Sequence, residues 1–447
     1  MFDRFKLHIE TNLPFLISKK LLIANSGGID SMVLTHLFSK MEVELHVAHC
    51  NFQLRGEASD EDAEFVKKIT YLPSNQIYIN LFGTENYAKK HKLSIQLAAR
   101  ELRYQWFDEL LREKELDYIL TAHHADDNLE TFFINFTRGS GLEGLTGIPQ
   151  QNGNIVRPLL PFSREEISKY ASENKIEWRE DETNASTKYL RNKIRHEIVP
   201  LLKEINPSVL DSFSNTLEFL DQSQSIVDDR IASISKSIVK RKAQHGQEII
   251  EIDIPKLKEL SHPKAYLYQI LKQFNFTAWN DIHDLLNSQS GKQVFSSSHR
   301  LIKDREVLLV SKLQFDSQGS ISAEIDEFSK GISSPVNLKF DTQKRENSAG
   351  TTEILVDKDL LKYPLFVRKW KNGDYFYPTG MQGKKKVSKY FKDEKFSLLD
   401  KENTWILTNA DDEVIWIINK RQDRRFATTK NTKQRLKISC ATTSFSE

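Results

Sequence analysis

The sequence SGGIDS at residues 26–31 decides the fold of the first part of this chain. The apolar run before it, at 21–24, is typical of a buried strand, and the apolar residues after it recur at helical spacing. A strand, a Ser/Gly turn and a helix start form an anion site, because unpaired backbone N–H groups and the helix dipole converge there. We therefore expect a phosphate-binding turn made of Ser26, Gly27, Gly28, Ile29, Asp30 and Ser31.

Asp30 sets this turn apart from other phosphate-binding turns. A carboxylate repels phosphate unless a magnesium ion lies between them, so Asp30 predicts a metal–phosphate site. The P-loop pattern GxxxxGK[ST] does not fit the stretch, which disfavours ordinary P-loop chemistry. The alternative is a plain strand-to-helix turn without a ligand, although six matched positions in this context rarely arise by chance.

Length and composition limit the class of protein. A chain of 447 residues predicts two to three domains, and 39% hydrophobic with 28% charged residues is ordinary for a soluble protein. No apolar stretch approaches the roughly 20 residues that a membrane helix needs, and the first residues lack a signal-peptide pattern. The two cysteines, Cys50 and Cys440, form neither a disulfide framework nor a CxxC site. We therefore expect a cytoplasmic protein.

Charge is distributed unevenly along the chain. Residues 362–447 hold 19 Lys and Arg against 10 Asp and Glu, whereas residues 1–361 hold 45 against 52. A basic C-terminal module on a slightly acidic body suggests a polyanionic partner, nucleic acid first. A solvated lysine-rich face is the alternative.

Hydrophobic patterning predicts the domain organisation. Residues 1–205 alternate apolar runs with helical patterns, as in a doubly wound, mostly parallel α/β sheet. The expected strands lie at 21–24, 43–48, 76–80 and 118–122. A long helix is expected within 94–115, and Ser163-Arg164-Glu165-Glu166 is a capping box that opens another helix.

Three further regions follow the sheet domain. Residues 206–315 are expected to be mainly helical, with a long helix towards Lys242, helices near 263–274 and 279–286, and strands at 249–254 and 307–310. Residues 316–352 are polar and Ser/Gly-rich, and we expect a linker there. Residues 353–440 are expected to form a small α+β domain, in which 405–408 and 414–418 make a hairpin.

A second polar cluster, HHADDNLET at 123–131, follows the strand expected at 118–122 and runs into a helix. Open α/β sheets bind ligands at this end of their strands. Asp127 and Glu130 are three residues apart, so both carboxylates share a helix face and could hold magnesium or receive a substrate ammonium. A zinc site is disfavoured, because no third histidine or cysteine has ligand spacing. An N-capped helix with an acidic start remains the structural alternative.

Two further patterns bear on the chemistry. GSGLEG at 139–144 matches GxGxxG literally, but it follows a helical pattern, so a helix C-cap is favoured over a dinucleotide turn. Arginines lie one turn apart at Arg100 and Arg103, and again within RNKIRH at 191–196, in a helical stretch expected to end at Pro200. Guanidinium groups bind phosphate oxygens bidentately, although a solvated helix face is the alternative for each cluster.

Together these runs resemble the tRNA(Ile)-lysidine synthetase family of PP-loop ATP-pyrophosphatases. The similar runs are SGGIDS (26–31), HVAH and LRGEASDEDAEF (46–65), LAARELRY (97–104), AHHADDNLETF (122–132), TRGSGLEGL (137–145), RPLL (157–160) and RNKIRHEIVP (191–200). Other PP-loop families share the first of these motifs. The resemblance extends more loosely over 367–391, and it departs at Ala48, where the family often has Asn or Asp.

The resemblance implies an ATP-dependent ligase that modifies tRNA(Ile) with a CAU anticodon. O2 of the wobble cytidine would be adenylated with release of pyrophosphate, and the amine of free L-lysine would then displace AMP from C2. Asp30 and Asp127 would act around magnesium, and Glu130 would receive or deprotonate lysine. His123, Arg103 and Arg195 would stabilise phosphate and the adenylated intermediate.

The resemblance also assigns tRNA contacts. Residues 206–315 would contact the tRNA, and the basic C-terminal domain would bind its body through Lys384, Lys385, Lys386 and Lys389. Lysines there would meet phosphates without reading bases. The sequence leaves the oligomeric state open, a homodimer being one alternative.

Other functions of the superfamily fit the sequence less well. A tRNA thiolase would need catalytic cysteines or an iron–sulfur cluster, and Cys50 with Cys440 cannot hold a cluster. A glutamine-dependent amidotransferase would need a nucleophilic cysteine domain. A tRNA-binding protein with a degenerate loop is the non-enzymatic alternative, which the intact Ser26, Asp30 and acidic pair disfavour.

Overall fold

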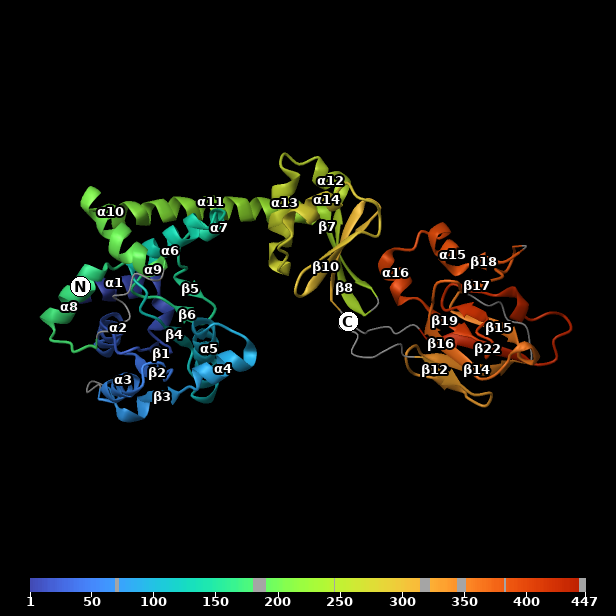
Figure 1. Cartoon of the computed structure of the whole chain (residues 1–447), viewed down its shortest axis with the longest axis horizontal. Helices are drawn as coiled ribbons and strands as arrows, with labels where there is room; N and C mark the ends of the chain where they lie inside the picture. Colours follow the sequence, from blue (N-terminus) through green and yellow to red (C-terminus); the bar gives the residue numbers. More distant parts are fainter. Residues whose placement is uncertain are drawn as a thin grey trace. The chain divides into compact units, whose positions relative to one another are not determined.

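The chain divides into two units, Met1–Asp228 and Asp229–Glu447 (Figure 1). The computed structural model describes residues 1–68, 72–179, 190–244, 246–313, 322–343, 351–381 and 383–441. Among the described residues, no helix is both long and apolar enough to cross a membrane.

A six-stranded sheet forms the centre of the first unit, in the order β3-β2-β1-β4-β6-β5. Its strands are β1 (Lys20–Ala24), β2 (Glu44–Asn51), β3 (Ile77–Leu81), β4 (Tyr118–Leu120), β5 (Gln151–Asn152) and β6 (Ile155–Val156). All neighbours run parallel except β5 and β6. The four strands expected from the sequence are confirmed, with shifts at their ends. The strand order reverses between β1 and β4, and open sheets bind ligands at such a point.

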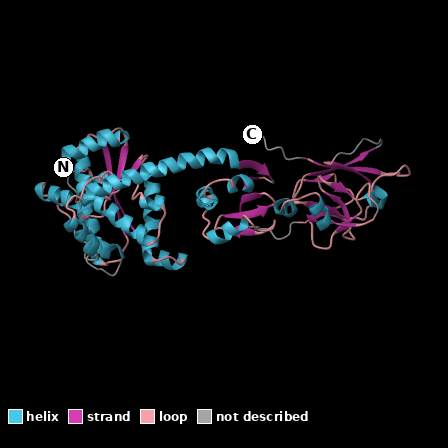
Figure 2. Cartoon of the chain, turned by 90° about the horizontal axis from the view of Figure 1, so that it is seen from above, coloured by secondary structure: helices cyan, strands magenta, loops and turns pink. Residues whose placement is uncertain are grey.

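Helices cover both faces of this sheet, as Figure 2 shows for the first unit. They are α1 (Phe2–Asn12), α2 (Ile29–Ser39), α3 (Glu57–Lys67), α4 (Thr84–His91), α5 (Ile95–Glu113), α6 (Ala125–Thr137), α7 (Leu142–Leu145) and α8 (Arg164–Glu173). The expected capping box of α8 is confirmed, because Ser163 Oγ accepts from the Glu166 backbone N–H at 3.1 Å.

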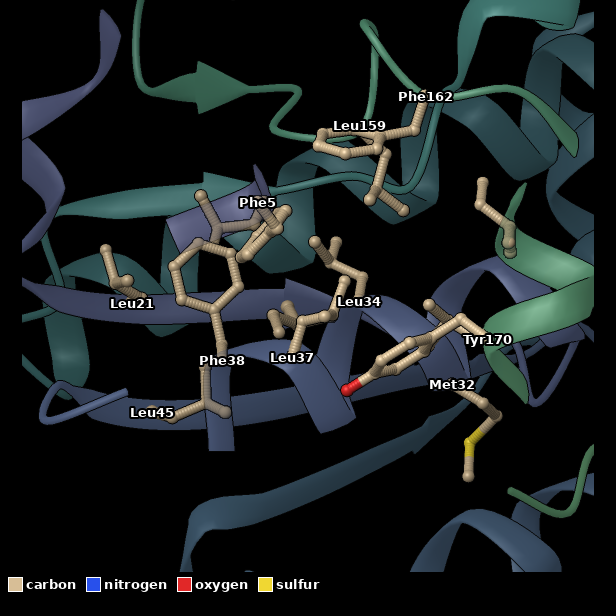
Figure 3. Packing of buried hydrophobic residues seen from close by; sticks show 14 of the residues in the cluster. Phe5, Leu21, Met32, Leu34, Leu37, Phe38, Leu45, Leu159, Phe162 and Tyr170 are labelled. Atoms are coloured by element: carbon tan, nitrogen blue, oxygen red, sulfur yellow. The ribbon is translucent and has the colours of Figure 1, made fainter. Parts of the chain in front are cut away.

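The buried side chains of β1 explain the two covered faces. Leu21 and Ile23 pack with α1 and α2, whereas Leu22, between them in the chain, packs with α5 on the other face. Figure 3 shows the first cluster, in which the side chains of Phe5 and Phe38 lie against one another. A strand that is apolar at every position is what a sheet covered on both faces requires.

The basic run at 191–200 lies in one continuous helical segment. It consists of α9 (Leu190–Lys193), a π-helical turn (Ile194–Ile198) and α10 (Val199–Ile205). The expectation that the helix ends at Pro200 is therefore wrong. Pro200 is the second residue of α10 and directly follows the π-helical turn, so the segment changes its hydrogen-bond pattern there instead of ending.

The second unit begins within α11 (Val209–Ile238), which the first unit also shares. Helices α12 (Ile254–Lys258), α13 (Pro263–Leu271) and α14 (Trp279–Leu285) follow. The last two lie near the positions predicted, whereas α12 was not expected. They pack on a five-stranded antiparallel sheet, β7-β8-β11-β10-β9, made of β7 (Val239–Gln244), β8 (Gln247–Asp253), β9 (Gln293–Phe295), β10 (His299–Asp304) and β11 (Val307–Lys312). The region is thus helical with an added sheet, and the long helix expected to run towards Lys242 ends at Ile238, where β7 begins.

The C-terminal part of the second unit consists of two sheets and a short hairpin. One sheet has the order β12-β16-β19-β20-β21 and the other β13-β14-β22-β15. The strands are β12 (Ala323–Ile325), β13 (Gly331–Ile332), β14 (Leu338–Gln343), β15 (Glu353–Asp357), β16 (Leu365–Lys369), β17 (Tyr375–Phe376), β18 (Lys385–Lys386), β19 (Trp405–Thr408), β20 (Val414–Ile417), β21 (Arg421–Gln422) and β22 (Arg435–Cys440), with helices α15 (Val387–Asp393) and α16 (Leu398–Asn403). The hairpin expected at 405–418 is confirmed by the antiparallel pairing of β19 and β20.

The segment expected to be a linker, 316–352, differs from that expectation where it is described. Strand β12 pairs with β16, and β14 pairs with β22, so both belong to the C-terminal sheets. Ile325, Leu338 and Phe340 are buried in the core of this part. The strands are short and their other residues are polar, which is why the composition resembled a linker.

Candidate active site

A cavity of about 1450 Å³ opens at the carboxyl ends of β1, β2 and β4. It is lined by the 26–31 turn, by the start of α6 and by the basic segment of α9 and the π-helical turn. The structure thus brings together all the candidate catalytic residues: Asp30, Arg103, His123, Asp127, Glu130 and Arg195. The lysines of the C-terminal module belong to the other unit.

A buried asparagine shapes the phosphate-binding turn. Asn25 Oδ1 accepts from the Gly27 backbone N–H at 2.7 Å and from Ser31 Oγ at 3.0 Å. Gly27 has φ +84°, a left-handed conformation that favours glycine, and Gly28 is the N-cap of α2. Hydrogen bonds to the Asn25 side chain therefore fix the shape of the turn. The start of α2 lines the cavity.

Asp30 lies in the first turn of α2, and its two carboxylate oxygens have different surroundings. Its Oδ2 is paired with Arg164 of α8. Its Oδ1 is buried, has no hydrogen-bond partner among the described residues, and lies 3.8 Å from His124 Nε2. Asp30 thus keeps one oxygen available to a cation from the cavity.

His124 links Asp30 to the acidic start of α6. Its Nε2 lies 3.4 Å from Asp127 Oδ2, and its backbone N–H donates to the same oxygen at 3.2 Å. The side chain is 4% exposed. Asp30 and Asp127 therefore flank one imidazole, which puts the two carboxylates close together at the switch point of the sheet.

Two arginines bind the acidic pair Asp127 and Glu130. Arg195 Nε lies 2.5 Å from Glu130 Oε1, and Arg191 Nε lies 2.8 Å from Glu130 Oε2. Both arginines also place Nη2 at 3.0 Å from Asp127 Oδ1. Burial by itself would raise the pKa of Asp127, but the neighbouring His124, Arg191 and Arg195 together hold that pKa below its usual value.

His123 is neutral at neutral pH. Burial lowers the pKa of its imidazole to about 4, an effect larger than that of the nearby Asp127 carboxylate, which acts in the other direction. Its Nδ1 lies 3.0 Å from Thr121 Oγ1. The imidazole therefore offers the cavity a hydrogen-bonding group and no positive charge.

Arg103 and Arg100 take different positions on α5. Arg103 lines the cavity with its guanidinium 5.3 Å from the centre of the Phe52 ring. Arg100 is exposed and lies over the Tyr104 ring at 4.9 Å. Of the two, Arg103 is the one positioned to reach a ligand in the cavity.

The donor set is suitable for magnesium held jointly with phosphate. In the described part of the chain, no group of three or more His, Cys, Asp and Glu could hold a metal by itself. Magnesium in nucleotide enzymes commonly takes one or two carboxylates and completes its shell with phosphate and water. The unpartnered Oδ1 of Asp30, near the Asp127 carboxylate, meets that requirement.

Several cavity residues were missed by the sequence assignment: Asn25, His124, Asp126, Arg164, Arg191 and Lys203. Asp126 accepts from the Arg164 backbone N–H at 2.8 Å and pairs with Lys203 at 2.6 Å. A local signal existed for Asn25, His124 and Asp126, which adjoin assigned residues, and for Arg191, which lies about one helical turn before Arg195. Arg164 and Lys203 reach the site from other elements, and their spacing in sequence gives no signal.

The candidate tRNA-binding lysines lie in one stretch of the second unit: Lys384 directly before β18, Lys385 and Lys386 on β18, and Lys389 on α15. Lys384 lies 5.1 Å from the centre of the Tyr375 ring, and Lys386 and Lys389 are exposed. Lys385 Nζ is paired with Asp393 at 2.7 Å, and its side chain is 15% exposed. Lys385 is therefore committed to an ion pair, whereas Lys384, Lys386 and Lys389 present charge to solvent.

The comparisons with known proteins cover nearly the whole chain. The PP-loop domain family matches residues 4–202, and the TilS substrate binding domain family matches residues 244–313. The tRNA(Ile)-lysidine synthase of Parabacteroides distasonis is 36% identical over 446 residues, which cover 97% of this chain and 98% of that one. The synthase of Bacteroides thetaiotaomicron is 37% identical and that of Porphyromonas gingivalis 36%, covering 96% and 91% of this chain and 96% and 90% of those proteins.

Proposed function

This chain belongs to the tRNA(Ile)-lysidine synthase family, and we propose that the cavity of its first unit is where lysidine is made. The enzyme is a PP-loop ligase that uses ATP and a tRNA. In the reaction, ATP adenylates O2 of the wobble cytidine and pyrophosphate leaves. The amine of lysine then bonds to C2, the C2–O2 bond breaks, and AMP departs with that oxygen. The observation that carries the proposal is the phosphate turn and the acidic pair in one cavity.

The phosphate turn would bind ATP. The start of α2 and the left-handed Gly27 let backbone N–H groups approach phosphate oxygens, while Asn25 keeps the turn in shape. Asp30 and Asp127 would hold magnesium, which when bound neutralises charge on the departing pyrophosphate. Arg103 and Arg195 would bind the remaining phosphate oxygens, because guanidinium stays charged and binds bidentately.

The acidic pair would bind lysine, the third substrate. Asp127 and Glu130 offer two carboxylates on one helix face, and the Glu130 side chain is 1% exposed. A substrate ammonium is a chemically suitable partner for buried carboxylates. Neutral His123 would hydrogen-bond the phosphate, since its lowered pKa keeps it uncharged. The same low pKa makes it a weak base, so Glu130 is the better proton acceptor for the attacking amine.

The reaction itself provides the test. Purified protein incubated with ATP, L-lysine and tRNA(Ile) bearing the CAU anticodon should add one lysine, less one water, to the wobble nucleoside. Mass analysis of the digested tRNA measures this change. We place the reaction in the cytoplasm, where these three substrates are available.

The basic module would hold the body of the tRNA by its phosphates. Replacing Lys384 and Lys386 together by glutamine should weaken tRNA binding and lower the slope of log affinity against log salt by about two units, one for each phosphate that a lysine no longer neutralises. Filter binding over a range of salt concentrations measures both quantities. Lys385 is left in place because its charge is already paired with Asp393.

Lys89 and Lys90, which are exposed on α4, provide the matched control. Replacing that pair by glutamine removes the same charge and should leave the salt slope near its wild-type value. ATP affinity should be unchanged in both double variants. A wild-type affinity and slope in the Lys384/Lys386 variant would show that the tRNA docks elsewhere.

A further inference from the structure

The carboxylates of the cavity are neutralised by cations of the chain itself. Asp30 is paired with Arg164, Asp126 with Lys203, and Asp127 and Glu130 share Arg191 and Arg195. The four groups of the last cluster sum to zero charge. An added ammonium would make this cluster net positive in a partly buried site, which is unfavourable while both arginines remain.

The arginines occupy the oxygens that a lysine ammonium would need. Glu130 Oε1 is bound by Arg195, and Glu130 Oε2 is bound by both Arg191 and Arg195, at 2.5 to 3.0 Å. Asp127 Oδ1 accepts from both arginines, and Asp127 Oδ2 accepts from the His124 backbone N–H. In this state the described residues already use every oxygen of the acidic pair.

The two sides of the cluster differ in exposure. The carboxylates belong to the first turns of α6 and are 12% and 1% exposed, whereas the Arg191 and Arg195 side chains are 41% and 33% exposed. Arg195 sits on a π-helical turn, a form that occurs mostly as single turns at functional sites. The guanidinium groups can therefore swing into the cavity while the carboxylates stay in place.

We propose that Arg191 and Arg195 occupy the lysine site of the ligand-free enzyme and vacate it when they bind the phosphates of ATP or of the adenylated tRNA. Lysine then binds second, to a pair of carboxylates that the phosphate has freed. This inference rests on the proposed function, in which Asp127 and Glu130 receive lysine. The inference adds Arg191 to the residues that bind phosphate. It also explains, from the charges of Asp127, Glu130 and the two arginines, why phosphate binds before lysine.

Lysine binding to the full-length protein tests the inference. Equilibrium dialysis with labelled L-lysine is carried out alone, with the non-cleavable analogue α,β-methylene-ATP and magnesium, and with the analogue plus tRNA. Lysine affinity should rise on the order of tenfold or more when the analogue is present, and by linkage lysine should raise the affinity for the analogue by the same factor.

Substitutions at Arg191 show whether the arginine competes with lysine for the carboxylates or only supports the structure of the site. Arg191→Gln keeps hydrogen-bond donors but removes one competing charge, so ligand-free protein should bind lysine more tightly than wild type and the effect of the analogue should shrink. Arg191→Lys, which keeps the charge, should retain the wild-type pattern in part. Arg112→Gln on α5, exposed and outside the cavity, is the matched control and should keep the full coupling.

The outcomes distinguish this inference from the proposed function. Equal lysine affinity with and without the analogue, abolished by Glu130→Gln, would overturn the ordered exchange and leave the lysine site standing. Weaker lysine binding in ligand-free Arg191→Gln would also overturn it. No lysine binding even with analogue and tRNA present would overturn both the inference and the lysine site.

Discussion

Replacing Asp30 by alanine should reduce lysidine formation roughly a hundredfold to a thousandfold, the usual loss when a preorganised charged group is removed from an active site. Asp30 has one buried oxygen with no hydrogen-bond partner among the described residues, and its place in the turn puts it where a metal and phosphate would meet. The loss should appear in the adenylation step. The initial rate of labelled lysine incorporation into tRNA measures the effect.

Binding of tRNA by the Asp30→Ala protein should stay near wild type, because the basic lysines lie in the other unit. Asp30→Asn keeps the shape of the side chain and should lose nearly as much activity, which separates the charge from packing. Asp108→Ala, an exposed position on α5, is the matched control and should retain activity. Wild-type turnover in Asp30→Ala would refute the assignment of the phosphate site.

Replacing Glu130 by glutamine should raise the lysine concentration needed for half-maximal rate by on the order of tenfold to a hundredfold, and the ATP requirement much less. A hydrogen bond to a charged group contributes about 1.5–3 kcal/mol, and glutamine keeps the shape while losing the charge. The Glu130 side chain is 1% exposed, so solvent does little to screen the loss. Initial rates at varied lysine with saturating ATP, and the reverse, separate the two requirements.

The contacts of Glu130 suggest a second role, the anchoring of two arginines. The same initial rates distinguish it from lysine binding. If Glu130 only anchors Arg191 and Arg195, which line the same cavity as the 26–31 turn, the ATP and lysine requirements should rise together. Equal increases would therefore contradict a lysine-binding role. Glu85→Gln on α4, an exposed position, controls for the loss of one negative charge from the first unit.

Local patterns predicted the elements around the site because each has a local cause. Strand β1 is apolar at successive positions, and Ser163 with Glu166 forms a capping box. The glycine after α6 also behaves as expected. Gly139 has φ +74°, and the Gly139 and Ser140 N–H groups donate to Phe136 and Asn135 oxygens, which ends the helix. In each case the residues that decide the structure are close in sequence.

Features that depend on distant partners could not be predicted in this way. The Arg164–Asp30 pair joins residues 134 positions apart, and Lys203 reaches Asp126 from α10. Strand β7 is an edge strand whose residues are mostly exposed, so its sequence carries no alternation and resembled a continuation of α11. Strand β12 is recognisable only through its pairing with β16.

This chain uses ATP to put lysine on the wobble cytidine of tRNA(Ile). The most direct measurement is the mass of that nucleoside after incubation of the CAU-anticodon tRNA with wild-type protein, ATP and L-lysine. We predict a cytidine that has gained one lysine less one water, only when ATP is present, with one AMP and one pyrophosphate released for each lysine added. An unchanged wobble cytidine, or a modification that forms without lysine, would show that the chain does not make lysidine.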